Sequence, residues 1–248
     1  MTSFDGAILA TFWLLLTVNI SRPQGWQQLC QKSRADWTLD LFGLSIQGVV
    51  IPAMQIGLLY KTFHWLLPQA AHCIALPPLA GFFFCTILVD YAYYWNHRWL
   101  HSRAWALHRV HHTVTQLDIL GTSRNSLWSS FFILYLWVHA LMIYLLHNPS
   151  GYLWGITLTA MLDLWRHSQL GPRPNGWLYA VLSPWLVLPQ DHAYHHANWR
   201  QAVNFGANLK VWDRLHHTAY NAHSLPNRLA QQTPLNLWQQ LFYPFELR

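Results

Sequence analysis

The segment from His97 to His112 reads HRWLHSRAWALHRVHH, with five histidines, three arginines and no acidic residue. A second histidine-rich run, PQDHAYHHANW, begins at Pro189. Side chains three or four residues apart share one face of a helix, so the histidines within each short run are expected to point at a common centre. The spacing predicts three clusters, which are H-x-x-x-H at His97 and His101, H-x-x-H-H at His108, His111 and His112, and H-x-x-H-H at His192, His195 and His196.

Eight imidazoles exceed the three or four protein ligands that one zinc ion takes. The clusters therefore predict a site for two metal ions. Imidazole binds zinc, copper, iron and nickel, so the ligand type alone leaves the metal open.

The composition places these clusters in a membrane protein. Of the 248 residues, 53% are hydrophobic and only 10% are charged, against about 25% charged in an ordinary soluble domain. With long apolar runs and 16 tryptophans, the chain is expected to be an all-α, polytopic membrane helical bundle, carrying its histidines in a helical cap. The net charge of +6 is better explained by membrane topology than by binding to nucleic acid.

A membrane span needs roughly 20 apolar residues. The first and the last of five apolar segments are short for this, so about four to five spans are expected. A sixth stretch, Trp177–Pro189, is interrupted by Pro184 and is predicted to lie at the membrane interface. The five segments are Ala7–Ile20, Leu41–Tyr60, Cys73–Trp95, Leu127–Leu146 and Gly151–Trp165.

The basic residues indicate an orientation. If the N-terminus is outside and the chain crosses five times, every Lys and Arg except Lys61 falls on one side, together with the three histidine clusters. Because loops rich in Lys and Arg stay in the cytoplasm, the clusters are expected to face the cytoplasm.

The histidine pattern resembles that of the membrane fatty acid hydroxylase/sterol desaturase superfamily. The likeness extends to Asn204-Phe205-Gly206 and to the run Val211–Leu215, which is similar to the N-[YF]-G and W-D-x-L motifs of that family. His167 stands where many members have a histidine. The resemblance covers about residues 82–218 and departs from the family pattern at His216-His217-Thr218, where Phe-Gly-Thr is usual.

The resemblance implies an O2-dependent, non-haem di-iron monooxygenase that hydroxylates or desaturates an unactivated C–H bond of a lipid. Zinc is a conceivable substitute metal. The eight cluster histidines would be iron ligands, with His167 as a further ligand or a supporting residue. Asn204 and Asp213 would support ligand histidines, as such side chains usually do in metal sites. Residues 1–72 would be N-terminal membrane helices, and residues 73–248 would form the catalytic region of a single domain.

Other predictions concern the residues around the clusters. Asp90 precedes His97 by seven residues and should share its helix face, so it is a candidate hydrogen-bond acceptor for that histidine or a residue of the substrate cavity. Asp163 precedes His167 by four residues and raises the same possibility for that histidine. The chain has no cysteine-rich or haem-attachment motif, so electrons are expected from a separate cytochrome b5-like or ferredoxin-like protein. The roles of His139, His216 and His217 stay open.

The alternatives are weaker. A membrane zinc hydrolase would require an acid beside its ligands, as in H-E-x-x-H, and none of the clusters has one in that position. A bis-histidine haem protein would need facing histidines at mid-membrane, and a metal transporter would need ligands along a path through the bilayer. The sequence does not distinguish hydroxylation, desaturation and ether cleavage, nor a fatty acyl, sterol, carotenoid or ether lipid substrate.

Overall fold

The computed structural model describes residues 3–197, 203–221, 224–226, 229 and 233–245. Every regular element in these residues is helical, which confirms the predicted all-α class. The α-helices are α1 (Ser3–Ile20), α2 (Pro23–Gln31), α3 (Arg34–Ser45), α4 (Ile51–Ala53), α5 (Tyr60–Leu66), α6 (Pro78–Phe83), α7 (Asp90–Arg103), α8 (Trp105–His108), α9 (Ser129–Phe132), α10 (Leu134–Leu145), α11 (Ser150–Arg166), α12 (Trp177–Leu182), α13 (Pro189–Ala197), α14 (Val211–Leu215) and α15 (Leu237–Phe242).

Several of these helices join into longer rods. Two π-helical stretches, η1 (Ile46–Val50) and η2 (Met54–Leu59), connect α3, α4 and α5 into one rod, and η4 (Phe84–Val89) connects α6 to α7. Three 3₁₀ turns complete the set: η3 (Pro68–Ala70), η5 (His111–Thr113) and η6 (Ile119–Ser123). Pro52 lies in α4 between the two π-helical stretches. These wider turns accommodate a proline that cannot donate a backbone hydrogen bond, so the rod continues through it.

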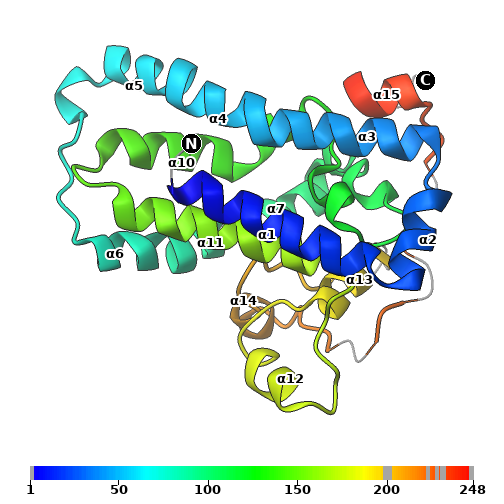
Figure 1. Ribbon diagram of the computed structural model, residues 1–248. Coiled ribbons are helices and arrows are strands. Elements are labelled where there is room, and N and C mark those ends of the chain that lie inside the picture. The colour runs from blue at the N-terminus through cyan, green and yellow to red at the C-terminus, as the bar shows by residue number, and fades with distance from the viewer. Residues whose placement is uncertain (1–2, 198–202, 222–223, 227–228, 230–232, 246–248) are drawn as a thin grey trace.

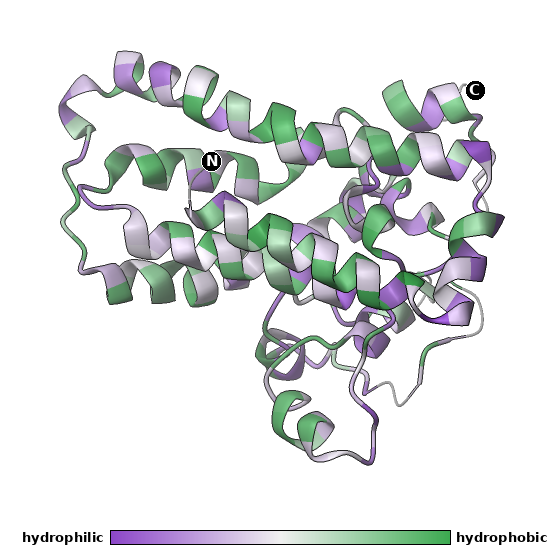
Figure 2. Cartoon of the chain, viewed as in Figure 1, coloured by the Kyte–Doolittle hydropathy of each residue, from purple (hydrophilic) through white to green (hydrophobic). Residues whose placement is uncertain are grey.

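The rods lie side by side as an elongated bundle, with α5 and α6 at one end and α2 and α13 at the other (Figure 1). Helix α11 packs against both α1 and α6. The close approach of α11 to the α6–α7 rod requires glycine at position 155, because a Cβ there would lie 2.6 Å from the Cβ of Cys85. In Figure 2 hydrophobic residues recur along the rods, whereas hydrophilic residues gather at the end that holds α2 and α13.

Two of the described helices are long and apolar enough to cross a membrane: Ser3–Ile20 and the rod Arg34–Leu66. Only 6% and 11% of their apolar windows are buried inside the protein. Large side chains such as Trp13, Val49 and Trp65 point outward with 61%, 68% and 80% exposure. Exposed apolar helices of this length are typical of a protein whose solvent is lipid. The full number of spans and the cytoplasmic position of the cap stay predictions.

The third and fourth apolar segments differ from the expected boundaries, whereas α11 matches the fifth, Gly151–Trp165, to within one residue at each end. The third helix begins at Pro78, because proline is favoured in the first turn of a helix, and it continues past Trp95 to Arg103. The fourth segment is divided at Ile133, whose backbone is extended, so α10 has only 12 residues. The stretch from Trp177 forms one short helix and a turn, as its prolines suggested.

Candidate metal centre

The structure brings nine histidines together at the end of the bundle opposite α5 and α6. Helix α7 carries two of them, α8 and η5 carry three, the C-terminal end of α11 carries one and α13 carries three. They form two groups, and within each group the nearest ring nitrogens all lie within 4.8 Å of one another. The five-histidine group contains His97, His101, His108, His112 and His195, and the four-histidine group contains His111, His167, His192 and His196.

The two H-x-x-H-H motifs are each divided between the groups. In the first motif, His108 and His112 join the five-histidine group and His111 joins the other. In the second motif the division is reversed, because His192 and His196 belong to the four-histidine group and His195 to the five-histidine group. The expectation that each motif points at a single centre was therefore wrong. Residues i and i+4 share a centre, and the histidine between them turns to the neighbouring one.

The distances between ring nitrogens fit shared metal ions. Two nitrogens bound to one metal at 2.0–2.1 Å lie about 2.9–3.4 Å apart for bond angles between octahedral and tetrahedral values. In the five-histidine group the Nε2 atoms of His97 and His108 are 3.0 Å apart, and those of His101 and His195 are 3.2 Å apart. In the four-histidine group, the Nε2 atom of His192 is 2.9 Å from that of His167 and 3.0 Å from that of His196.

The remaining ring nitrogens of several histidines are held by backbone carbonyl groups. The Nδ1 atom of His97 lies 2.8 Å from the carbonyl oxygen of Phe205, and that of His195 lies 2.7 Å from the oxygen of Val203. A carbonyl can only accept a hydrogen bond, so Nδ1 carries the proton and Nε2 presents its lone pair to the centre. His167 Nδ1 has the same arrangement with the carbonyl of Asp163 at 2.8 Å. This tautomer is the one that a metal ligand requires.

Burial keeps most of the clustered imidazoles neutral. Desolvation holds the pKa of His111 at about 3 and that of His195 at about 4. The same effect, reinforced by neighbouring histidines, holds the pKa of further members well below the ordinary value of 6.5; these are His97, His108, His112, His192 and His196. Both ring nitrogens of His112 are buried without a hydrogen-bond partner among the described residues, and a metal ion would occupy the lone pair of one of them. The residues present therefore fit a pair of metal ions.

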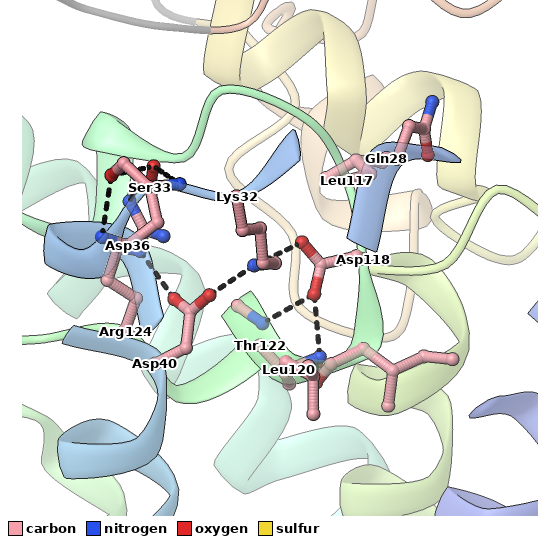
Figure 3. Close-up of polar contacts among 12 residues, drawn as sticks. Gln28, Lys32, Ser33, Asp36, Asp40, Leu117, Asp118, Leu120, Thr122 and Arg124 are labelled. Carbon is pink, nitrogen blue, oxygen red and sulfur yellow. Dashed lines mark hydrogen bonds and ion pairs between the residues drawn. The ribbon is translucent and has the colours of Figure 1, made fainter. Parts of the chain in front are cut away.

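A buried ionic network supports the segment that carries His111 (Figure 3). The Arg124 guanidinium donates to Asp40 at 2.6 Å and to Asp36 at 2.8 Å, so it joins the loop before α9 to the first turns of α3. The carbonyl oxygen of Arg124 lies 3.3 Å from His111 Nδ1, and its guanidinium also reaches the carbonyl of Thr113 at 3.2 Å. Arg124 thus joins a membrane-facing helix to the four-histidine group.

Lys32 closes the same network from the other side. Its ammonium group pairs with Asp40 and lies 2.7 Å from Asp118. The Asp118 carboxylate also caps η6 by accepting from the backbone amides of Leu120 and Gly121. The side chains of Lys32 and Asp40 are almost fully buried, with 8% and 0% exposure. Each charge is compensated, which buried ionic groups require.

A second buried pair holds α13. Lys210 and Asp191 are both fully buried, with Lys210 Nζ 2.8 Å from Asp191 Oδ2. Asp191 directly precedes His192, and its carbonyl accepts from the Asn204 side chain at 3.0 Å. Asn204 therefore holds α13 near the histidine groups, and within the described part of the chain its side chain bonds to the backbone of Asp191 and Tyr220 and not to a clustered histidine. It adopts a φ of 56°, a conformation in which Asn is enriched among non-glycine residues.

Asp213 acts through the backbone as well. Its carboxylate accepts from the amides of Phe205 at 2.7 Å and Gly206 at 2.8 Å, and from the Thr218 hydroxyl at 2.7 Å. Because the Phe205 carbonyl is the partner of His97, Asp213 holds the acceptor in place instead of contacting the histidine itself. Burial raises the pKa of Asp213 to about 6 despite these hydrogen bonds.

The two acids expected beside histidines behave differently. Asp163 reaches its predicted neighbour, with Oδ1 3.2 Å from His167 Nδ1, and it also pairs with Arg166 at 2.6 Å. Asp90 is buried on α7 and receives three N–H groups, from the amides of Asn208 and Leu209 and from the Trp212 indole. Asp90 therefore fastens the loop before α14 to α7, and no contact joins it to His97 among the described residues.

The remaining histidines of interest lie outside both groups. The Nδ1 atom of His139 lies 2.9 Å from the Tyr152 hydroxyl, and this hydrogen bond links α10 to α11. His216 stacks on Tyr91 and Tyr94 and lies 3.1 Å from the Tyr91 hydroxyl. His217 is exposed and has a φ of 56°.

Sequence reasoning missed the ionic network and the carbonyl acceptors. One signal was available, because Asp36 and Asp40 lie four residues apart at the start of an otherwise apolar helix. Charges are costly there and indicate buried partners. The carbonyls of Val203 and Phe205 carry no signal in residue identity, since any residue supplies a carbonyl.

The segment that carries the histidines is similar to known proteins. The fatty acid hydroxylase family model matches residues 82–218, which is more than half of the chain. Curated relatives include the ornithine lipid hydroxylase OlsE of Rhizobium tropici, which is 29% identical over 54% of this chain and 40% of its own length. The fatty acid hydroxylase vlmA of a Lecanicillium species is 32% identical over 53% of this chain and 40% of its own length.

The alkylglycerol monooxygenase of Xenopus tropicalis is 28% identical over 52% of this chain and 28% of its own length. The matched region thus spans well under half the length of these relatives. No solved structure matches the chain significantly. The matched residues contain all nine histidines of the two groups and the loop that orients His97, and the chain belongs to the fatty acid hydroxylase family.

Proposed function

We propose that the protein is a multi-pass membrane oxygenase that hydroxylates an unactivated C–H bond of a lipid, with its active site on the cytoplasmic side. One oxygen atom of O2 would enter the C–H bond as a hydroxyl group and the other would leave as water. This balance requires two protons and two electrons, which a separate cytochrome b5-like or ferredoxin-like donor would supply.

The observation that carries the proposal is the convergence of nine histidines into two groups at metal-ligand spacing. We assign one iron ion to each group. Bound there, the two ions would supply the O2 activation that side chains cannot provide, with electrons from the separate donor protein. The chain keeps the imidazoles neutral by burial and fixes their tautomers through backbone carbonyls. It also shields the centre from water, because eight of the nine histidines are fully buried.

The relatives support a lipid substrate, since their names describe the oxidation of an ornithine lipid, an alkylglycerol and a fatty acid. The ligand set supports oxidation over hydrolysis. Both groups consist of histidine alone among the described residues, and no carboxylate occupies the position of a general base within them.

The test is oxygen incorporation. The purified protein, reconstituted in nanodiscs with ferrous iron, a chemical reductant and an extracted lipid mixture, should convert a lipid to a product 16 mass units heavier, or 18 when the gas is ¹⁸O2. Anaerobic incubation and the His112→Ala variant are the controls. An O2-independent hydrolysis product with a single zinc per chain would contradict the proposal.

The topology has its own test. A reporter fused behind the C-terminus should be found in the cytoplasm, together with the histidine cap. An external reporter would refute the five-span arrangement without affecting the metal assignment.

A further inference from the structure

The five-histidine group is accessible at His101. Of the nine histidines, only His101 is partly exposed. Its side chain lines a cavity of about 460 Å³ at the end of α7, whose walls include Trp95, Trp99, Trp105 and Phe205. Cavities of this size, with apolar walls and a few polar groups, are typical of small-molecule sites. A molecule in this cavity would lie against a histidine of the candidate metal centre.

Two arginines give the cavity its charge. Arg98 and Arg103 both line it, and neither has an ion pair with a carboxylate among the described residues. The lack of partners distinguishes them from Arg124 and Arg166, which are paired with aspartates. Unpaired guanidinium groups beside an aromatic wall leave a site for an anion, and guanidinium binds carboxylate and phosphate through two parallel hydrogen bonds.

Arg98 is held in place before any ligand arrives. Its guanidinium carbon lies 5.0 Å from the centre of the Trp95 ring and 5.8 Å from that of Phe205, and one nitrogen donates to the Tyr94 hydroxyl at 3.3 Å. These contacts use the faces of the aromatic rings and leave further N–H donors free.

The spacing along α7 joins the charge to the metal centre. Arg98 and His101 are three residues apart and share a helix face, with about 5–6 Å between such Cβ atoms. Trp95 and Trp99 are 45% and 41% exposed, and tryptophan is favoured at the boundary between lipid headgroups and acyl chains. The cavity thus combines a cationic end, an aromatic wall and a metal ligand within two helical turns.

We propose that this cavity is the substrate site and that it takes an amphipathic lipid with an anionic headgroup, a carboxylate or a phosphate. Arg98 and Arg103 bind the headgroup, and the acyl or alkyl chain lies along the tryptophans past His101. The assignment rests on the proposed function for its meaning as a substrate site, but the binding itself requires no turnover.

The experiment measures equilibrium binding of radiolabelled dodecyl phosphate and of dodecanol to the iron-loaded protein in phosphatidylcholine nanodiscs, without reductant. The variants are Arg98→Gln, Arg98→Lys and Arg103→Gln, with Arg173→Gln as the matched control because Arg173 is exposed and lies outside the cavity lining. Each cavity Gln variant should weaken dodecyl phosphate binding by on the order of tenfold and leave dodecanol binding unchanged. Arg98→Lys should retain part of the affinity, because the charge stays but the two-pronged geometry is lost.

Several results would overturn the assignment. Equal affinity for dodecyl phosphate and dodecanol, or full dodecyl phosphate affinity in both Gln variants, would show that the arginines bind no headgroup. Inorganic phosphate that competes as strongly as dodecyl phosphate would mean that the site takes a free anion. Unchanged lipid binding with slower reduction by an acidic donor protein would assign the surface to that donor. Iron content and thermal unfolding of each variant separate these outcomes from misfolding, and oxygen incorporation tests the proposed function independently.

Discussion

The two histidine groups differ in what surrounds them. The five-histidine group opens through His101 to an aromatic cavity with two arginines, whereas every member of the four-histidine group is buried. Behind the four-histidine group stands the ionic network of Lys32, Asp40 and Arg124, which reaches His111 through a carbonyl. We infer that the first group faces the substrate and that the second depends on packing against α3. Substitutions around the two groups should therefore differ in their effects on turnover, iron content and thermal stability.

The largest effects are expected from the ligands themselves. His112→Ala in the five-histidine group and His196→Ala in the four-histidine group should each lower turnover by at least about 100-fold, because the proposed chemistry needs both metals and even outer-shell losses cost 10–100-fold. Each variant should bind about one iron per chain instead of two. Metal analysis and product assays check this. The exposed His147→Ala variant is the control, and full activity in either ligand variant would remove that histidine from the centre.

Loss of a carboxylate from the ionic network should affect the four-histidine group before the five-histidine group. Asp40→Asn leaves the buried Arg124 and Lys32 charges partly unpaired, and such losses cost about 3–5 kcal/mol. The expected result is a lower thermal midpoint and loss of iron that begins with one of the two ions. Asp36→Asn is a graded comparison, because the Asp36 side chain is 18% exposed while that of Asp40 is fully buried. Equal losses in the two variants would contradict the role of the buried network.

Two glycines on the α3–α5 rod test the packing of α3 against the loop before Arg124, with a smaller expected effect. A Cβ on Gly43 would lie 2.1 Å from the Ser123 carbonyl oxygen, so Gly43→Ala must push α3 away from the loop before Arg124. Overpacking of this kind costs about 1–3 kcal/mol. Gly48→Ala on the same rod meets nothing within 4 Å and should be neutral or slightly stabilising. The thermal midpoint and the iron content of the two variants are compared. Equal values for Gly43→Ala and Gly48→Ala would mean that the contact at Gly43 is not tight.

Mild acid should weaken the metal-free protein. The pKa values of His111 and His195 are about 3 and 4 in the folded chain and about 6.5 when unfolded. Between pH 6.5 and 4 the unfolded chain binds protons that the folded chain does not, so the free energy of unfolding falls as the pH falls. Each such histidine contributes up to about 1.4 kcal/mol per pH unit. A thermal midpoint of the metal-free protein that is constant from pH 7 to pH 5 would contradict this.

The comparison of the two groups also shows what the sequence could predict. The spacing of H-x-x-x-H and H-x-x-H-H reports helix faces, so local geometry identified histidines that gather in space. Their number, which is more than one metal ion can bind, predicted the second group. The division of each motif between the two groups did not follow, because each group combines histidines from several elements far apart in the sequence. Periodicity along one helix carries no information about the neighbouring element.

The same limit explains the supporting residues. Asp163 was correctly placed beside His167 because both lie on α11, four residues apart. Asp90 and Asp213 were predicted to support histidines directly. Their carboxylates instead accept hydrogen bonds from backbone amides of the loop before α14. The start of α6 at Pro78 agrees with residue identity, because proline is favoured in the first turn of a helix.

The most direct test of the two-centre assignment is the metal content of the purified wild-type chain. Protein produced with iron and purified without chelators should contain close to two irons per chain, with no haem absorbance. His112→Ala and His196→Ala should each retain about one. A single zinc per chain, or a haem spectrum, would contradict the assignment of a metal ion to each histidine group.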